Sequence, residues 1–403
     1  MRRIVFVNRY FAPDHSATSQ ILTDLALHLA GQGRDVHVIA ADETYDGERN
    51  LPGFELLGGV NVHRVKSGGF GRAGLARRAA DAMALYWAMR RAALKLLRPD
   101  DILVSKTDPP LLSVPMANAA ARCRAHHVSW LQDLYPEVAA ALGVSAARGR
   151  PGDALAFLRN RAARNAAMNV VIGERMRDRL LACGVEPGRI CVIPNWSDDE
   201  AIRPVDPDDN PLRRQWGLNA KFVVGYSGNL GRAHECDTLV AAARLLRARE
   251  DIVFLFIGGG HQIDRLRAEI GSAGLSGMFR FQPYQKREDL TFSLGVPDAH
   301  WISLRPELEG MIVPSKFFGI AAAGRPTISV TDAHGETASL VNRYACGLVV
   351  APGDGAGLAA AIERLAAHPD ERLRMGVNAR AIVDGDFAKK ASLRRWATLL
   401  DEL

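Results

Sequence analysis

The feature that most constrains the fold is an alternation of short apolar segments with amphipathic segments. The chain begins RIVFVNRYFAPDHSATSQILTDLALHLAGQGRDVHVIAA, which predicts a strand, a polar loop, a helix closed by Gly31-Gln32-Gly33 and a second strand. This order is a βαβ unit, which implies a parallel sheet with right-handed crossovers. Further strands are predicted at DILVS, HHVSWLQ, MNVVIG and ICVIPN.

The same pattern starts again in the second half of the chain. KFVVGYSGNLG, DIVFLFIGGG, MFRFQPY and DAHWISL are predicted strands, and CDTLVAAARLLRAR and HQIDRLRAEIG are predicted helices. The Asp- and Pro-rich stretch NWSDDEAIRPVDPDDNPLRRQWG between the two series is typical of a domain boundary. Since 403 residues exceed one ordinary core, we predict an α/β protein with two doubly wound domains, residues 1–195 and 196–385.

Composition narrows the class of protein. Five cysteines without a CxxC pair argue against a disulfide framework or a zinc ribbon and favour a reducing compartment. The chain opens directly into a strand and contains no run of about 18 apolar residues, so we expect no signal peptide, no membrane span and a cytoplasmic location. The net charge of +6 suits an anionic small molecule, an acidic membrane surface or a nucleic acid.

The segment EGMIVPSKFFGIAAAGRP, residues 309–326, predicts a short helix that begins near Ser315 and ends at Gly324. Two of its residues fit a helix badly. Lys316 adds positive charge to a first turn that is already positive, and an interior glycine, Gly319, costs roughly 1 kcal/mol relative to alanine. A diphosphate beside Lys316 and a ribose close to Gly319 would explain both. The alternatives are a solvated lysine and tight helix packing.

Two glycine-rich turns follow predicted strands of the second half. YSGNLGR and FIGGGHQ place glycines where backbone N–H groups can approach a phosphate or a base, ahead of a helix N-terminus. Neither matches G-x-G-x-x-G, and the alternative for each is a tight turn that needs a positive φ. Because both turns fall in one predicted domain, they favour a nucleotide site there.

The order and spacing of these motifs resemble those of the family-4 retaining glycosyltransferases of GT-B fold, above all those of bacterial surface-polysaccharide and O-antigen assembly. The resemblance rests on QDLYPE, VIPNWSD, GNLGRAHE, VPSKFFGIAAAGRP and GETASLVNRYACGLVVAPGDGAGLAAAIERL, and it extends over essentially the whole chain. It implies two Rossmann-like domains that face a cleft. It also implies a C-terminal helix, residues 386–403, that crosses back to the first domain.

The resemblance implies transfer of a sugar from a nucleotide-sugar donor, with retention at the anomeric carbon, to a glycan or polyprenyl-linked acceptor. We expect a UDP donor in preference to a GDP donor, bound mostly on the second domain. The residues expected to bind it are Gly228, Asn229, Gly231, Arg232, His234, Gly258, Gly259, Tyr284, Glu309, Val313, Ser315, Lys316 and Gly319.

Two departures from the family's pattern concern the donor. Typical members carry Glu-x7-Glu, and the position of its second glutamate, which bonds the ribose, is Gly319 here. Glu309 is therefore our best candidate to contact the donor sugar. Typical members also place an Arg and a Lys where this chain has Asn229 and His234. Arg232 lies between them and would grip phosphate oxygens together with Lys316, whereas His234 is a phosphate contact or a surface histidine.

Two segments of the first domain are expected near the donor sugar or the acceptor. SWLQDLYPE ends a predicted strand, and its Gln132 stands where family members often have a histidine that touches the sugar. Asp133 follows it, as a catalytic candidate or a helix cap. In YFAPDHSATSQ, Asp14, His15 and Ser16 precede a helix and are expected to close over the donor phosphates or the acceptor.

The expected chemistry needs fixed positive charge. Cations and helix N-termini can stabilise a leaving diphosphate without a metal, and retention in this family is ascribed to front-face attack in which the leaving phosphate deprotonates the acceptor. The catalytic candidates are Glu309, Asp133, Arg232 and Lys316. Asp198-Asp199 and Asp208-Asp209 lie in the boundary stretch, where we expect solvated turn residues. We predict no metal and no cofactor beyond the nucleotide-sugar co-substrate.

Two basic segments, residues 77–99 and 148–165, mix Arg and Lys with large apolar side chains at helical spacing. One interpretation is peripheral contact with the acidic inner leaflet, which would bring the enzyme to a lipid-linked acceptor. The other is a crossover helix with one core face and one solvated face. Nucleic acid is disfavoured as a partner because no recognition module accompanies the charge.

Two alternative functions stay open. The chain could be a GT-B epimerase or phosphorylase, although we find neither a dense set of acidic residues nor a pyridoxal phosphate lysine. It could also be a catalytically silent GT-B subunit that supports a partner transferase, which the missing glutamate of Glu-x7-Glu would favour.

Overall fold

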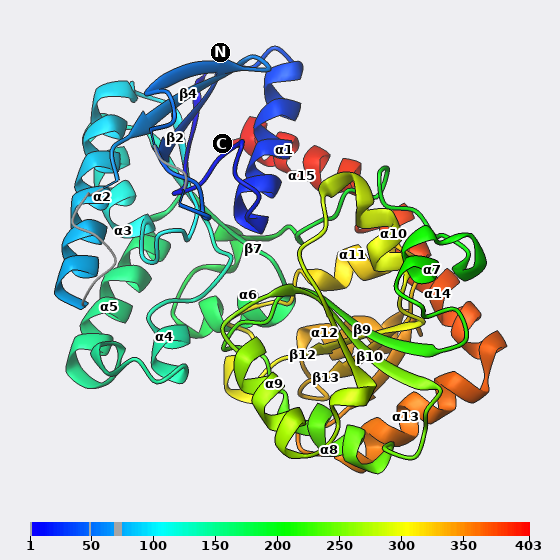
Figure 1. Cartoon of the computed structure of the whole chain (residues 1–403). Helices are drawn as coiled ribbons and strands as arrows, with labels where there is room; N and C mark the ends of the chain where they lie inside the picture. The colour runs from blue at the N-terminus through cyan, green and yellow to red at the C-terminus, as the bar shows by residue number, and fades with distance from the viewer. Residues whose placement is uncertain (1, 48–49, 68–74) are drawn as a thin grey trace. The chain divides into compact units, whose positions relative to one another are not determined.

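The computed structural model describes residues 2–47, 50–67 and 75–403, except for the side chains of residues 75–79. The chain forms two compact units (Figure 1). Unit 1 comprises Met1–Pro194 and Leu393–Leu403, and unit 2 comprises Asn195–Ser392. Each unit is built on one sheet with helices on both faces, so the predicted α/β class with two doubly wound sheets is confirmed.

Within the described residues, the sheet of unit 1 has eight strands in the order β3-β4-β2-β1-β5-β6-β7-β8. All neighbours are parallel except β3 and β4. The strands are β1 (Ile4–Val7), β2 (Val36–Ala41), β3 (Phe54–Leu57), β4 (Val60–Val65), β5 (Ile102–Ser105), β6 (His126–Trp130), β7 (Met168–Val171) and β8 (Ile190–Val192). The central strands are continuous apolar runs because helices cover both faces.

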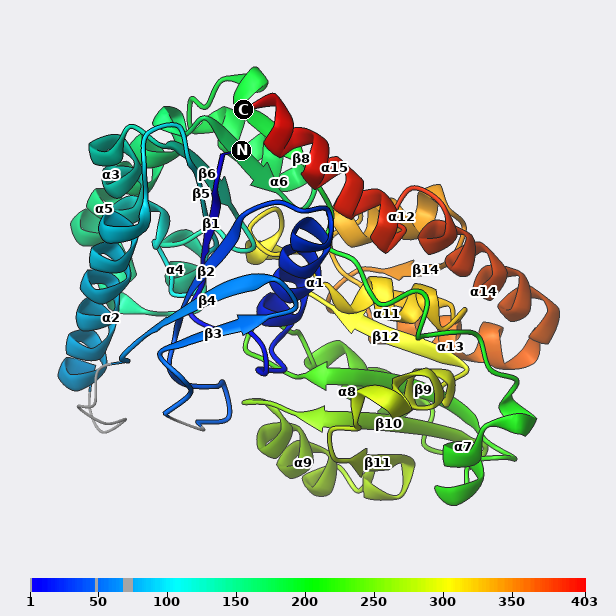
Figure 2. The same ribbon diagram turned by 90° about the horizontal axis from the view of Figure 1, so that it is seen from above.

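The helices of unit 1 divide between these two faces. They are α1 (Ala17–Gly31), α2 (Leu75–Leu96), α3 (Ser113–Cys123), α4 (Glu137–Ala141), α5 (Gly149–Asn165) and α6 (Glu174–Ala182). Figure 2 shows α1 on the opposite side of the sheet from α2 and α3. Val5 and Val7 of β1 point toward α2 and α3, where they pack with Leu85, Met89 and Met116.

The sheet of unit 2 has six strands in the order β11-β10-β9-β12-β13-β14, all parallel within the described residues. The strands are β9 (Phe222–Asn229), β10 (Ile252–Gly259), β11 (Phe279–Gln282), β12 (Ala299–Ser303), β13 (Thr327–Val330) and β14 (Gly347–Val350). The helices are α7 (Pro211–Gln215), α8 (Asp237–Leu245), α9 (Ile263–Ser272), α10 (Leu290–Gly295), α11 (Lys316–Ala322), α12 (Glu336–Arg343), α13 (Gly355–Ala367) and α14 (Pro369–Asp384).

Unit 2 has two apolar core layers, one on each face of its sheet. Residues of α8, α9 and α13 pack with Tyr226, Phe256 and Trp301 on one face of the sheet. Residues of α10, α11, α12 and α14 pack around Phe317 and Phe318 on the other. The helix α11 lies in the segment predicted to be helical, and it is followed by Gly324 at φ +65°.

The antiparallel pair β3–β4 was not predicted. Every other residue of β4 is buried, and β3 is half exposed, so neither strand has the continuous apolar run of a parallel strand. This pair forms one edge of the sheet of unit 1.

The acidic residues of the boundary stretch only partly match the expectation of solvated turns. Asp208 and Asp209 are exposed, as predicted. Asp199 is buried, however, and its Oδ2 accepts the backbone N–H of Lys389 at 2.8 Å. Lys389 is the first residue of α15 (Lys389–Glu402), and the first N–H groups of a helix lack partners within it. The prediction was therefore wrong for Asp199, which caps the last helix.

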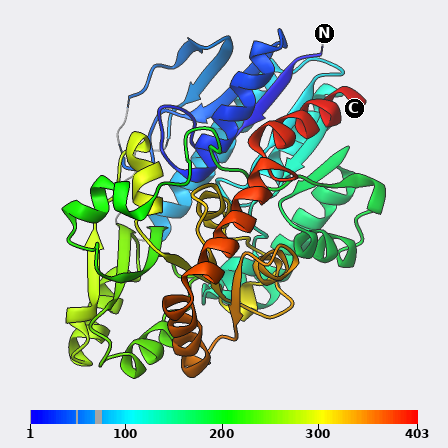
Figure 3. The ribbon, with the colours of Figure 1, turned by 90° about the vertical axis from the view of Figure 1, so that its right-hand side faces the viewer.

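The last helix, α15, packs on unit 1 through its final residues (Figure 3). Trp396 is fully buried, and its ring centre lies 4.4 Å from that of Trp130 at the end of β6. Arg34, just beyond α1, also donates to Asp401 at 2.7 Å. The predicted return of the C-terminal helix to the first domain is thus confirmed.

We expect Trp396→Ala to destabilise unit 1 by about 3–5 kcal/mol, because it leaves a cavity beside Trp130. Hydrogen–deuterium exchange should show faster exchange in β6 and β7, with unit 2 unchanged. Thr398→Ala, at an exposed position of the same helix, is the control. Unaltered exchange in β6 would contradict the claim that the stability of unit 1 depends on the packing of Trp396 against Trp130.

Candidate functional site

The candidate site lies where each sheet reverses its winding. In unit 1 the chain leaves β1 toward β2 and β5 toward β6, and in unit 2 it leaves β9 toward β10 and β12 toward β13. Doubly wound sheets bind ligands at the carboxyl ends of the strands beside such a switch point. Most predicted donor residues follow β9, β10 and β12, and the predicted acceptor loop follows β1.

The carboxyl ends of β9 and β10 pair with each other through glycines, with Gly258 opposite Gly228. The φ angle is +120° at Gly228, +122° at Gly258 and +133° at Gly260, values that side chains rarely adopt. A Cβ atom on Gly258 would lie 2.5 Å from the carbonyl oxygen of Gly228, and one on Gly260 would lie 2.4 Å from the nitrogen of Leu230. The positive φ that the alternative required is therefore present at Gly228 and Gly258, but in the paired ends of two strands and not in tight turns.

Lys316 lies against the carboxyl end of β9. A Cβ atom on Gly228 would lie 2.9 Å from Lys316 Cε, and Lys316 Nζ lies 5.3 Å from the centre of the Tyr226 ring. Burial lowers the pKa of Lys316 to about 8. In the part of the chain that the structure describes, the ammonium has no ion pair or hydrogen bond. Lys316 is thus not a simple solvated lysine.

Gly319 is not explained by tight packing. A Cβ atom there would lie 3.5 Å from Leu294 Cδ1 and 3.7 Å from Ser197 Oγ, which are ordinary van der Waals distances. The helix α11 could therefore accommodate an alanine, so the packing alternative fails.

His234 is buried, and the structure gives it a different place from either prediction. Its Nδ1 lies 2.7 Å from the carbonyl oxygen of Ser303, which can only accept, so Nδ1 carries the proton and Nε2 faces the Tyr226 hydroxyl at 3.0 Å. Burial, and secondly the charge of Lys316, lower the pKa of His234 to about 3. We correct the prediction: His234 is a neutral residue that fixes its loop, not a cationic phosphate ligand or a surface histidine.

Arg232 and Asn229 are exposed at the same turn. Arg232 Nη2 lies 3.0 Å from His261 Nε2, in the turn after β10. The loop itself is held by Gln262, whose Nε2 donates to the carbonyl oxygens of Gly231 and His234 at 2.8 and 2.7 Å. Arg232 is therefore an exposed cation on a loop that hydrogen bonds hold in place. A Cβ atom on the neighbouring Gly231 would have no atom within 4 Å, so close packing does not require glycine there.

Tyr284 lies along the turn after β10. Its Cε1 would be 3.0 Å from a Cβ atom on Gly258, and its Cε2 would be 3.3 Å from one on Gly259. Tyr284 is largely exposed. Its aromatic ring is therefore accessible to a ligand beside Gly258 and Gly259. The structure thus brings Gly228, Gly258, Gly259, Tyr284 and Lys316 together.

Glu309 is engaged by another part of unit 2. Its Oε1 accepts the backbone N–H of Glu336, the first residue of α12, at 2.8 Å. A Cβ atom on Gly335 would lie 2.5 Å from Glu309 Oε2. Burial raises the pKa of Glu309, and the backbone donors partly offset this effect. Glu309 thus anchors the start of α12. Of its neighbours, Val313 is buried and Ser315 precedes α11 without a side-chain cap.

In the loop before α1, which was predicted to close over the donor phosphates or the acceptor, Asp14 is buried and organises the entry to the helix. Its Oδ1 accepts from Ser16 N at 2.8 Å and from Ser16 Oγ at 2.5 Å, and its Oδ2 accepts from Tyr45 N at 2.6 Å. His15 is exposed. The three predicted residues therefore lie at one loop, where Asp14 has a structural role and His15 is accessible.

A buried charged cluster next to this loop was missed by the sequence analysis. Lys106 is fully buried, donates to the carbonyl oxygen of Thr18 at 2.9 Å and lies 3.9 Å from the centre of the Trp130 ring. Asp108 and Asp133 lie close enough to shift its pKa. The signal was the pair of charges in SKTDPP, directly after the buried strand β5.

Desolvation dominates this cluster. It lowers the pKa of Lys106 to about 7 and raises the pKa of both Asp108 and Asp133 to about 6. The charge of Asp108 raises the pKa of Asp133 further, whereas Arg9 and Lys106 lower the pKa of Asp108. Asp133 does not cap α4, since that helix begins after Pro136 without a side-chain cap. The helix-cap alternative is therefore wrong. Perturbed ionisable groups at a switch point are typical of functional sites.

Gln132 is buried beside the cluster, and its backbone N–H donates to Thr107 Oγ1 at 3.2 Å. This contact joins the loops that follow β5 and β6. The structure therefore brings Gln132 and Asp133 to the same end of the sheet as the loop before α1.

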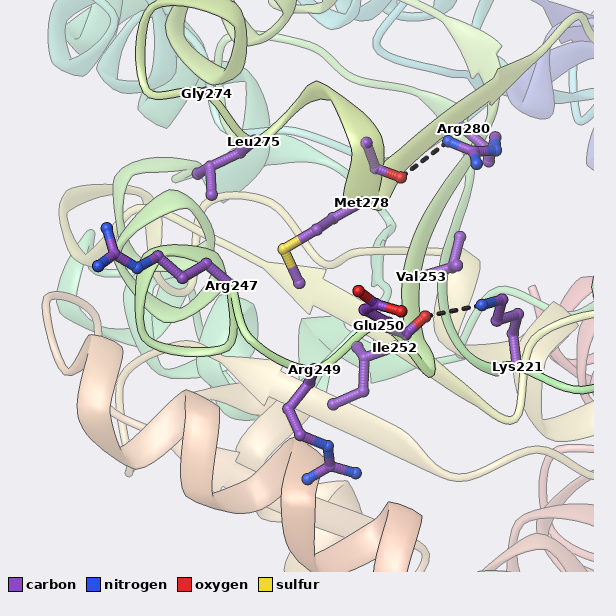
Figure 4. Close-up of a pocket in the computed structure, with 11 residues that line it drawn as sticks. Lys221, Arg247, Arg249, Glu250, Ile252, Val253, Gly274, Leu275, Met278 and Arg280 are labelled. Atoms are coloured by element: carbon purple, nitrogen blue, oxygen red, sulfur yellow. Dashed lines mark hydrogen bonds between the residues drawn. The ribbon is translucent and has the colours of Figure 1, made fainter.

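A separate pocket of about 290 Å³ lies at the amino ends of β9, β10 and β11, opposite the donor turns. Figure 4 shows Arg247 and Arg249 pointing in different directions, while Lys221 donates to Glu250 O and Arg280 to Gly277 O. Its charges do not converge on one point, and it holds none of the predicted site residues.

The described residues 2–47, 50–67 and 75–403 contain no group of three or more His, Cys, Asp or Glu side chains that could hold a metal ion. They also contain no helix long and apolar enough to cross a membrane.

Comparison with known proteins gives both units a family. Residues 17–196 match the family described as "Glycosyl transferase 4-like domain", and residues 208–382 match "Glycosyl transferases group 1". Both halves of the chain are glycosyltransferase domains. The glycosyltransferase resemblance inferred from the motifs is confirmed at this level.

Individual relatives agree with this assignment. The chain is 24% identical to "Probable glycosyltransferase WbjE" of Pseudomonas aeruginosa over 309 residues. This alignment covers 76% of each of the two chains. The chain is 29% identical over 254 residues to "Putative colanic acid biosynthesis glycosyl transferase WcaI" of Escherichia coli K12, 61% of each chain. The solved structure of Anabaena HepE in complex with UDP matches over the full length of both chains, with a TM-score of 0.75 and 16% identity. The predicted GT-B fold class is therefore confirmed.

We expect Asp133→Asn to stabilise the protein at about pH 8 relative to the natural chain, and less so at about pH 4. The pKa of Asp133 is raised on folding, so the stability that its protonated form contributes is lost as pH rises through about 6. The difference between the two pH values should be about 1–3 kcal/mol.

Thermal unfolding of both proteins at the two pH values measures this difference. Asp153→Asn, at an exposed position of α5, is the matched control and should show no such pH dependence. An equal effect of Asp133→Asn at both pH values would contradict the desolvation of the Asp133 carboxylate.

Proposed function

We propose that the protein is a retaining, metal-independent hexosyltransferase that uses a nucleotide-sugar donor, with UDP favoured over GDP. The glycosyltransferase domains support the reaction class. HepE, of the same fold, has been solved with UDP, with UDP and glucose, and with UDP-glucose, which supports the donor class. The proposal assigns the donor to unit 2.

The observation that carries this proposal is the unpaired ammonium of Lys316. A partly buried cation that costs desolvation energy and has no anionic partner in the described structure requires an explanation. It lies at the switch point of unit 2, beside the glycine-containing end of β9, whose N–H groups a diphosphate could approach. A leaving diphosphate would supply the missing anion and would be stabilised by it.

The other donor contacts lie beside the same strand end. Arg232, exposed on its pinned loop, would bind a second phosphate oxygen, and Asn229 would lie beside it. The ring of Tyr284 would stack on the base. Gly319 leaves room on α11 for the ribose.

We assign the acceptor to unit 1. Asp133 and Gln132 would bind hydroxyl groups of the acceptor or of the donor sugar, and the loop of Asp14, His15 and Ser16 would cover them. The buried charge of Lys106 would keep the neighbouring carboxylates ionised at neutral pH. The name of WcaI, a putative colanic acid biosynthesis glycosyl transferase, supports a role in glycan assembly. The acceptor that we propose is a glycan or a polyprenyl-linked glycan of surface-polysaccharide assembly, such as O-antigen, at the cytoplasmic face of the membrane.

A second candidate is a catalytically silent subunit that supports a partner transferase. The observation that favours it is Glu309, whose carboxylate caps α12 while Gly319 replaces the other glutamate of the family's motif. Incubation of the purified chain with a panel of UDP- and GDP-sugars, with a polyprenyl-linked glycan as acceptor, separates the two. Turnover of a donor by the chain alone excludes the silent subunit.

We expect the protein to bind UDP in magnesium-free buffer with a Kd in the micromolar range, and to bind GDP more weakly. Lys316→Ala and Arg232→Ala should each weaken binding about 10- to 100-fold, the usual effect of losing a charged hydrogen bond. Since the pKa of Lys316 is about 8, affinity should also fall as pH rises through that value.

Isothermal titration calorimetry measures these affinities. Lys286→Ala, at an exposed lysine of the same unit, is the control and should bind UDP normally. If neither nucleotide binds the natural chain, the donor assignment is wrong and the silent subunit becomes the leading candidate.

Gly319→Ala separates the fold from the ligand. The alanine fits the helix without a close contact, so it should leave stability unchanged or raise it by up to about 1 kcal/mol. If the ribose approaches Gly319, the same variant should bind UDP at least about 10-fold more weakly. Normal binding by a stable variant would contradict the ribose position.

A further inference from the structure

The helices α2, α3 and α5 form one layer on the sheet of unit 1. The helix α3 packs on both α2 and α5, and Figures 1 and 2 show the three on the same side of the sheet. The inner side of α2 buries Leu85, Met89 and Ala93 in the core. Its role as a crossover helix is therefore real, and the remaining question concerns the outward side of the layer.

The outward side of α2 carries large apolar side chains followed by cations. Met83 and Trp87 are 65% and 61% exposed, and Arg91 and Lys95 continue the same stripe at intervals of four residues. The guanidinium of Arg91 lies 5.2 Å from the centre of the Trp87 ring. The side chains of residues 75–79, including the first residues of the predicted basic segment, lie outside the described part.

The outward side of α5 repeats this arrangement. Phe157 and Leu158 are 58% and 43% exposed at the middle of the helix. Arg150 precedes them and Arg161 follows them, both exposed. Two helices of one layer thus present aromatic and aliphatic side chains to solvent between positive charges.

Positive charge exceeds negative charge on the outward side of this layer, where Asp153 of α5 is an exposed carboxylate. Arg91, Lys95, Arg98, Arg150 and Arg161 have no ion pair with a carboxylate among the described residues. A purely solvated helix face would not need four large apolar side chains, whereas an apolar protein partner would be opposed by so much unpaired charge. An anionic lipid bilayer accommodates both, because acyl chains take up the apolar groups and headgroups neutralise the cations.

We propose that the outward side of α2 and α5 is a membrane-docking face, with Met83, Trp87, Phe157 and Leu158 entering the headgroup region of an anionic bilayer. This inference deepens the proposed function, since it rests on a lipid-linked acceptor for its biological purpose. Binding of α2 and α5 to a bilayer does not require the donor site in unit 2. Docking would hold unit 1 at the surface where such an acceptor is found.

The test is co-sedimentation of the full chain with vesicles. We expect binding to vesicles of equal parts phosphatidylcholine and phosphatidylglycerol, no binding to phosphatidylcholine alone, and weaker binding at high salt because screening reduces the attraction. The double variant Trp87→Ser/Phe157→Ser and the charge variant Arg91→Glu/Arg161→Glu should each lower the fraction bound at least about 10-fold.

Matched controls lie on α14 of unit 2. Leu373 and Val377 are also exposed apolar residues, and Arg374 is an exposed cation between them. Leu373→Ser/Val377→Ser and Arg374→Glu should bind vesicles normally. UDP titration of every variant separates loss of docking from loss of the donor site.

Three results would overturn the proposal. One is no binding of the natural chain to the anionic vesicles, and another is an equal loss of binding in the α14 controls. The third is self-association in light scattering that Trp87→Ser/Phe157→Ser abolishes while vesicle binding persists, because the face would then be covered by a second copy of the chain.

Discussion

The backbone contact between Gly258 of β10 and Gly228 of β9 holds together the end of unit 2 at which we propose that the donor binds. Both residues have a positive φ, and the carbonyl of one occupies the space where the other would carry a Cβ atom. The aliphatic part of Lys316 lies on one side of this contact and the ring of Tyr284 on the other. Larger residues at either glycine would force the two strand ends apart and displace both side chains. Residues from four distant parts of the chain thus depend on one close approach.

Each of the two units retains charged groups in places that lower the stability of the fold. Lys316 has no anionic partner in the described structure, and Lys106 is buried with Asp108 and Asp133 nearby. Desolvation shifts the pKa of each of these groups toward its neutral form. By contrast, the buried Arg213 of unit 2 is fully engaged, since it pairs with Asp298 at 3.0 Å. A desolvated charge without an anionic partner, such as Lys316, marks a place where a ligand is expected.

Much of the fold could be predicted because parallel strands buried on both faces are continuous apolar runs, which the sequence displays directly. The β3–β4 pair could not be recognised in this way, because its alternating pattern is weaker. At the site, the odd features of Lys316 and Gly319 were readable from helix chemistry alone. The partners of His234 and Glu309 were not, because Ser303 and Glu336 reach them only through the tertiary fold. Lys106 and Asp108 were overlooked because a charged pair before two prolines resembles an ordinary loop.

The interleaving of the two units has a consequence for synthesis on the ribosome. Trp130, in the sheet of unit 1, packs against Trp396, which follows the whole of unit 2 in the sequence. The whole of unit 2 must therefore emerge before unit 1 can cover this part of its apolar surface. A nascent chain with a finished first sheet but no final helix exposes a tryptophan that chaperones could bind. Early termination of translation would thus impair the unit that was synthesised first.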